Sequence, residues 1–107
     1  MQLNKQKALQ ELGIPEEFYD ELMGDFITQT EGVLNKLDML KETDNFEEIA
    51  KLAHFIKGSA GNLRIDELYS IAKEIEFTAK EKKNIISSVE KLKSSFQGLK
   101  KIVLQDK

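Results

Sequence analysis

Hydrophobic residues recur every three or four positions along nearly the whole chain. Between residues 15 and 40 they fall on a single stripe of a helix with 3.6 residues per turn. Pro15 suits the first turn of that helix, and Glu16 and Glu17 complement the partial positive charge of its N-terminus. The stripe consists of Phe18, Tyr19, Leu22, Met23, Phe26, Thr30, Val33, Leu37 and Leu40. The pattern therefore predicts a long helix from Pro15 to about Leu40.

Three more long helices are predicted after it, over residues 46–62, from residue 66 to about 80, and from about 85 to 103. The breaks between them are KETDN, with Asp44 or Asn45 as a helix N-cap, then Leu63–Arg64, then KEKKN. A short helix over about 2–12, stopped by Gly13, precedes all four. The predicted buried faces are Phe46, Ile49, Leu52, Ala53, Ile56 and Ala60; Leu68, Ile71, Ala72, Ile75 and Ala79; and Ile85, Val89, Leu92, Phe96, Leu99 and Val103.

Each long helix has one apolar face, so none is stable alone, and short connections favour antiparallel neighbours. We therefore expect an all-α fold: an antiparallel up-down four-helix bundle over about 15–105, with a short additional N-terminal helix capping one end. No segment alternates as a strand does. At 107 residues the chain is expected to form a single domain, 1–107. Phe18, Phe26 and Phe96 are core residues by spacing, whereas Ile27 and Leu34 lie on a flank and fit either environment.

Composition narrows the function classes. The chain has no cysteine and one histidine, which argues against disulfides and metal clusters. A net charge of -3 disfavours nucleic-acid binding. The N-terminus shows no signal peptide or membrane span, so a cytoplasmic location fits. No helix has a second wide apolar stripe, so a monomer is expected. Met1 and the capping helix favour a free-standing protein over an excised domain.

The only histidine, His54, is predicted to face solvent. At about 100° per residue it lies about 160° from the core position Ile56. A lone histidine on a helix is ordinarily just a surface residue, but its neighbours are unusual. Ala50 lies one turn before it, Gly58 one turn after, and Gly61 about two turns after. Each mid-helix glycine costs about 0.5–1 kcal/mol relative to alanine, and the expected gain is room for another protein to approach the imidazole.

Lys51 and Lys57 lie three residues before and after His54, so both reach the same patch. Cations beside an imidazole are poorly placed to stabilise its protonated form and well placed to hold a phosphate on the ring. Phe55 lies about 100° from the core centre, where packing at the core edge and contact with a partner are equally compatible.

The run His54-Phe55-Ile56-Lys57-Gly58-Ser59-Ala60-Gly61-Asn62-Leu63 resembles the signature of histidine-containing phosphotransfer (HPt) domains. The preceding Leu52-Ala53, the later Leu68, Ala72, Ile75 and Glu76, and the upstream Phe18-Tyr19-Asp20-Glu21-Leu22 also resemble the family. The resemblance covers roughly residues 15–105. It implies a four-helix bundle whose exposed histidine accepts a phosphoryl group from a receiver-domain aspartate, or a kinase, and passes it to another receiver.

Carried over by position, the resemblance makes His54 the phosphorylated residue and Lys57 the lysine that faces the phosphate. Gly58 is the small residue that lets a receiver approach, and Arg64 stands where many members have glycine, which either alters the turn or adds a cation near the docking edge. The remaining docking candidates are Ala50, Lys51, Phe55, Gly61 and Asn62. The implied partners are response-regulator receiver domains and a sensor or hybrid histidine kinase. No cofactor is expected on this chain; the receiver would supply Mg²⁺ and acidic residues.

Three other functions compete with phosphotransfer. A helical adaptor that binds receivers without being phosphorylated is the main alternative, and the intact His54 and Lys57 argue against it. A self-contained kinase would need a nucleotide-binding glycine loop and an acid–base cluster, which the sequence lacks. A cofactor-binding bundle would need His54 to point inward.

Overall fold

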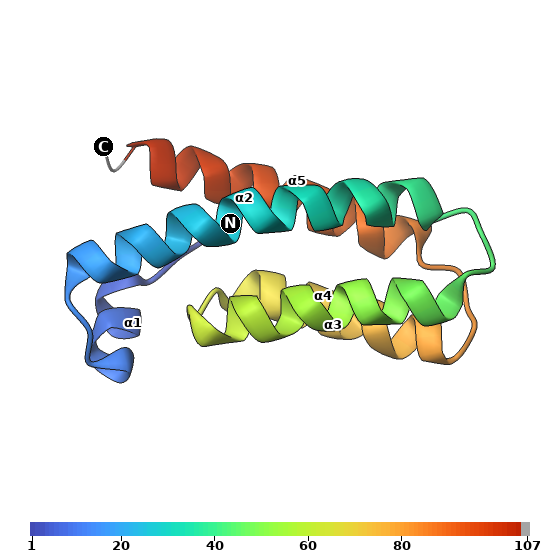
Figure 1. The fold of residues 1–107 in the computed structure, drawn as a ribbon, viewed down its shortest axis with the longest axis horizontal. Helices are drawn as coiled ribbons and strands as arrows, with labels where there is room; N and C mark the ends of the chain where they lie inside the picture. Colours follow the sequence, from blue (N-terminus) through green and yellow to red (C-terminus); the bar gives the residue numbers. More distant parts are fainter. Residues whose placement is uncertain (106–107) are drawn as a thin grey trace.

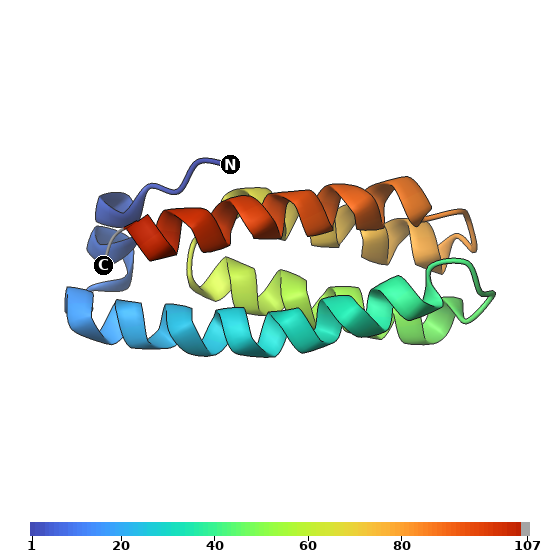
Figure 2. The same cartoon turned by 90° about the horizontal axis from the view of Figure 1, so that it is seen from above.

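The computed structural model describes residues 1–105, which form five helices: α1 (Lys5–Leu12), α2 (Glu16–Leu40), α3 (Phe46–Asn62), α4 (Asp66–Lys80) and α5 (Ile86–Gln105). The four long helices run antiparallel to their chain neighbours, with α2 and α5 forming one side of the bundle and α3 and α4 the other (Figure 1). Seen from above, α3 lies beside α2 and diagonally across from α5 (Figure 2). The predicted four-helix bundle with a short N-terminal helix is confirmed.

Helix boundaries agree closely with the sequence pattern, and α3 begins and ends at the predicted residues. The first helix starts later than expected, because the side chain of Asn4 accepts a hydrogen bond of 3.1 Å from the Lys7 amide and so caps it. Asn45 takes the N-cap position of α3, but its side chain makes no capping hydrogen bond there. None of the helices within residues 1–105 combines the length and apolar character needed to cross a membrane.

The core lies between the apolar faces of the four long helices. Its fully buried large side chains include Tyr19, Leu37, Ile49, Ile56, Leu68, Ile75, Ile85, Val89, Leu92, Phe96 and Leu99. Leu34 is buried and Ile27 is half-buried, which resolves the two flank positions. The prediction for Phe18 is wrong, since 48% of it is exposed. Neighbouring helical positions lie about 100° apart, and Tyr19 takes the inward direction that Phe18 would need.

A buried hydrogen bond joins α2 to the end of α3. The hydroxyl of Tyr19 donates to the backbone carbonyl of Leu63 over 2.8 Å. Leu63 is the residue that follows the last turn of α3, so its carbonyl has no partner within the helix. Tyr19 therefore satisfies a helix-end acceptor while filling core space, which fixes where α3 ends.

The turns after α3 and α4 share one geometry. Arg64 and Lys82 have positive φ values of 60° and 57°. In the first turn the Arg64 amide donates to Gly61 and the Ile65 amide to Ala60, the paired bonds of a Schellman motif. Arg64 thus adopts the left-handed conformation that glycine favours, so the turn geometry is kept. Its side chain binds Glu11 of α1 at 2.9 Å and the carbonyl of Gly61 at 3.0 Å.

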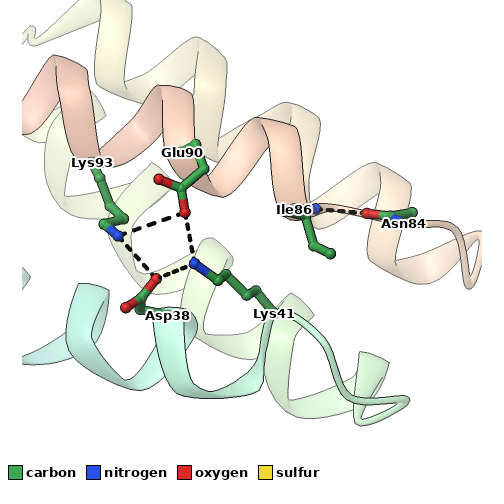
Figure 3. A network of polar contacts seen from close by, with 6 residues as sticks. All are labelled: Asp38, Lys41, Asn84, Ile86, Glu90 and Lys93. Atoms are coloured by element: carbon green, nitrogen blue, oxygen red, sulfur yellow. Dashed lines mark hydrogen bonds and ion pairs between the residues drawn. The ribbon is translucent and has the colours of Figure 1, made fainter.

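Four charged residues link the far end of α2 to α5 (Figure 3). Lys41 Nζ lies 2.8 Å from Asp38 and 2.7 Å from Glu90, and Lys93 Nζ lies 3.0 Å from Asp38. The two lysines lower the pKa of both carboxylates, and the carboxylates raise the pKa of Lys41. Because the network is solvent-exposed, it orients the two helices more than it stabilises the fold.

Candidate functional site

His54 projects from the middle of α3 on the side away from the core. Its side chain is 66% exposed, as its helical phase predicts, whereas Ala53 and Ile56 of the same helix are fully buried. The ring is nevertheless anchored. Its Nδ1 atom lies 2.8 Å from Oε2 of Glu76, which comes from the adjacent helix α4. The imidazole is therefore accessible and held in one orientation.

Glu76 is the centre of a cluster of polar groups between α3 and α4. Only 9% of its side chain is exposed. Its Oε1 lies 2.6 Å from Lys57 Nζ, and its Oε2 lies 3.4 Å from Lys80 Nζ as well as close to His54. Burial alone would raise the pKa of this carboxyl, but the contacts with Lys57, His54 and Lys80 outweigh burial and lower the pKa to about 2. Glu76 is consequently a carboxylate at neutral pH.

The contact with Glu76 determines which ring nitrogen of His54 is free. A carboxylate can only accept a hydrogen bond, so Nδ1 must carry the proton and donate it. In a neutral imidazole the other nitrogen, Nε2, then has an unprotonated lone pair. With the ring largely exposed, Nε2 is the nucleophilic atom that this site can offer to a reagent from outside.

Of the three small residues around His54, only Gly58 leaves open space. A Cβ placed on Gly58 would meet no atom within 4 Å. A Cβ on Gly61 would lie 3.2 Å from the ring of Tyr69 in α4, and Ala50 is only 8% exposed. The predicted open position of Ala50 and Gly61 is therefore wrong: both lie on the flank of α3 that packs on α4, where small side chains allow the helices to approach closely.

The other predicted docking residues are accessible. Lys51 is 68% exposed and pairs loosely with Glu47 at 3.5 Å. Phe55 is 43% exposed, and Asn62 is exposed at the end of α3. Asn62 also lines a shallow groove between α2 and α3, together with Phe18 and Leu22 from α2. An apolar surface thus continues from the α3 face onto α2.

A second groove opens on the other side of His54, between α3 and α4. Apolar atoms dominate its surface, with Phe46, Ala50 and Ala79 among its lining residues. The lysines Lys51, Lys80 and Lys82 also line it, together with Glu47, Glu76 and His54. The imidazole therefore stands beside a mostly apolar groove that also carries lysines.

Sequence reasoning missed Glu76 and Lys80 as site residues, although Glu76 was noted as part of the family resemblance. A signal was present. Glu76 lies between the core positions Ile75 and Ala79, about 100° from the first, where a helix faces its neighbour rather than solvent. Lys80 follows one turn later on the same flank. The sequence alone does not show that this flank of α4 faces His54.

No group of three or more His, Cys, Asp or Glu side chains that would suit a metal ion occurs in the part of the chain that the structure describes. Glu76, the carboxylate that contacts the ring, is itself contacted by Lys57 and Lys80, and Lys51 and Lys82 line the groove beside them. This donor set suits an anion better than a cation.

Fold and site together define a small helical-bundle domain that presents one anchored imidazole on its surface, beside lysines. The sequence model of the Hpt domain family matches residues 21–102, and the chain therefore belongs to the Hpt domain family. Membership implies histidine phosphotransfer in phosphorelays, in which such domains are carriers that interact with receiver domains and kinases. No curated protein and no solved structure matches the chain significantly.

Proposed function

We propose that this protein is a phosphoryl carrier in which Nε2 of His54 accepts a phosphoryl group from a receiver-domain aspartate, or from a kinase, and passes it to another receiver. The observation that carries the proposal is the contact between His54 Nδ1 and Glu76, which in the neutral imidazole leaves the lone pair of Nε2 free on an exposed ring. No other residue of the chain is a histidine, so the assignment is unique.

The transfer of the phosphoryl group needs no proton donor from this chain. Nε2 attacks the phosphorus of the aspartyl phosphate, the N–P bond forms, and the bond from phosphorus to the aspartate oxygen breaks. The aspartate leaves as a carboxylate, and the proton on Nδ1 stays in place. The imidazole ring gains positive charge as the N–P bond forms, and the carboxylate of Glu76, 2.8 Å from Nδ1, stabilises that charge.

The remaining machinery is assigned to the partner. The receiver supplies Mg²⁺ and its own acidic residues, and this chain uses no cofactor and has no kinase activity of its own. The absence of a nucleotide-binding glycine loop from the sequence supports that division.

The receiver is proposed to dock over α3 on the side that faces α2. Gly58 provides clearance next to His54, while the exposed ring of Phe55 and the amide of Asn62 lie along the same side. Phe18 extends this surface onto α2, and its 48% exposure makes it available for burial. Lys51 adds a cation that suits the acidic active site of a receiver.

The test is transfer from a phosphorylated receiver, with radiolabelled phosphate and Mg²⁺. The wild-type protein should acquire label that acid removes and base does not, as expected for phosphohistidine. His54→Gln should remain unlabelled yet still bind the receiver. Equal labelling of His54→Gln would refute the proposal, and receiver binding by a wild-type protein that never becomes labelled would favour the adaptor function instead.

A further inference from the structure

Two lysines contact Glu76, and they do so in different ways. We propose that Lys80 is the cation that binds the phosphoryl group on His54, and that Lys57 is a positioning residue whose ammonium holds Glu76 in place. The proposal rests on the proposed function of His54. It reverses the role that the family resemblance implies for Lys57.

Lys57 forms a close ion pair with the carboxylate of Glu76. Its Nζ lies 2.6 Å from Glu76 Oε1, and its side chain is only 24% exposed. Oε1 has no second partner among residues 1–105, so moving the ammonium away would leave one oxygen of a buried carboxylate unpaired. Such a loss is costly, because a buried charged oxygen loses solvent as well as its partner.

Lys80 is bound far more loosely. Its Nζ lies 3.4 Å from Glu76 Oε2, and its side chain is 67% exposed. That oxygen is already paired with Nδ1 of His54, so Glu76 stays paired at both oxygens when Lys80 leaves. At 3.4 Å the contact is longer than an ordinary charge-assisted hydrogen bond, and the ammonium is exposed, so a phosphoryl group within reach can take Lys80 away.

Charge balance favours the same division. Glu76 carries one negative charge and contacts two ammonium groups, so this cluster has one positive charge to spare. A phosphoryl group adds about 1.5 to 2 negative charges at neutral pH. Since Lys57 neutralises the carboxylate, Lys80 is the cation left for the phosphate. Its Nζ and the imidazole already contact the same oxygen, and its flexible stem needs only to rotate toward Nε2.

Lys51 is the competing cation. It is also exposed, at 68%, but its nearest carboxylate is Glu47 on its own helix, and it makes no ion pair with Glu76. It lies about 60° from His54 around α3, on the side opposite Lys57, although its side chain also reaches the groove between α3 and α4. This position suits contact with a docked partner better than contact with the phosphate.

The experiment phosphorylates the full chain at His54 with phosphoramidate, which needs no partner protein. The pKa of the phosphoryl group is then measured by ³¹P NMR, because a contacting cation lowers that pKa. Lys80→Met should raise it by about 0.5–1 pH unit and slow receiver transfer about tenfold, whereas Lys80→Arg should restore both. Lys101→Met on α5, diagonally across the bundle from α3, is the charge-matched control and should change neither.

Lys57→Met should leave the pKa of the phosphoryl group within about 0.2 pH unit of the wild-type value. It should change the ¹⁵N chemical shifts of the unphosphorylated His54 ring, because Glu76 is no longer held in place. Lys51→Met should leave both unchanged. The proposal is overturned if Lys80→Met has no effect on the phosphoryl pKa, or if Lys57→Met or Lys51→Met shifts it instead. A wild-type chain that phosphoramidate does not label at His54 would contradict the proposed function itself, which is a separate outcome.

Discussion

Nδ1 of His54 and Oε2 of Glu76 meet at 2.8 Å across the α3–α4 interface, so a largely exposed ring is held by a largely buried carboxylate. Exposure alone would leave the imidazole free to rotate and to exchange tautomers. The buried partner comes from a rigid neighbouring helix, which restricts both. The site therefore depends on how α3 and α4 pack as much as on the sequence around His54.

The first prediction concerns the tautomer of His54. In the wild type, ¹⁵N NMR of the neutral ring should show the proton mainly on Nδ1. Glu76→Ala should shift the population toward the Nε2-protonated form, which is favoured in free histidine, and should slow phosphotransfer by about tenfold or more. Glu74→Gln, at an exposed carboxylate two residues earlier that pairs with Lys91, is the matched control and should leave the ring unchanged. A wild-type ring protonated mainly on Nε2 would contradict the assigned nucleophile.

The second prediction concerns stability against pH. The pKa of Glu76 falls from its ordinary 4.5 to about 2 in the folded chain. The unfolded chain then takes up the proton first, so the stabilisation from Glu76 is complete above about pH 4.5 and disappears as pH falls toward 2. Urea unfolding at several pH values should show the wild type more stable than Glu76→Gln by about 1–3 kcal/mol at pH 7, with that difference shrinking below pH 4.5. A difference that grows on acidification would show that the sign is wrong.

The third prediction separates docking from folding. Gly58→Leu should fold normally and gain up to about 1 kcal/mol of stability, because leucine is the better helix former and a Cβ at this exposed position meets no other atom within 4 Å. Transfer from a receiver should nevertheless fall at least tenfold, because the new side chain occupies the approach to His54. Gly32→Leu, at an exposed glycine of α2 that also has open space around it, should gain stability and leave transfer unchanged. Normal transfer in the Gly58 variant would remove the clearance role.

Periodicity was sufficient to predict the helices, because each long helix has one apolar stripe and the breaks carry clear turn residues. It was also sufficient to place His54 outward. It failed at Phe18, because a first-turn residue on the edge of a stripe is buried only if a neighbouring helix extends far enough to cover it. Whether a neighbouring helix covers such a residue depends on how the helices are arranged in the bundle. The periodicity of a single helix does not contain that information.

The same limit explains the errors around the site. A single helix gives each residue an angle, but it does not show which flank carries the next helix. Ala50 and Gly61 looked like open positions beside His54, although α4 lies over them. Glu76 had a place in the family resemblance but no role at the site, because a single helix does not show that α3 covers it. Only the pairing of α3 with α4 brings Glu76 to the imidazole.

The fourth prediction tests the two left-handed turn residues. Lys82 has φ 57° and Arg64 has φ 60°, a conformation that costs a non-glycine residue about 1 kcal/mol. Lys82→Gly should stabilise the fold by about 0.5–1 kcal/mol in urea unfolding, because the relief of strain outweighs the added freedom of the unfolded chain. Arg64→Gly should change stability little, since it also loses the contacts with Glu11 and with the carbonyl of Gly61. Lys83→Gly, next in the chain and without positive φ, should give no gain.

The fifth prediction concerns the bond that ends α3. Tyr19→Phe keeps the buried ring but removes the hydroxyl that donates to the carbonyl of Leu63. The carbonyl then stays buried without this donor, so the free energy of unfolding should fall by about 1–2 kcal/mol. Because Leu63 directly follows α3, the backbone amides of its last turn should exchange faster with deuterium, while those around His54 should not. Tyr69→Phe, at a partly exposed ring on α4, is the matched control and should leave both measurements unchanged. Faster exchange spread evenly over α3 would mean that Tyr19 supports the helix as a whole rather than its end.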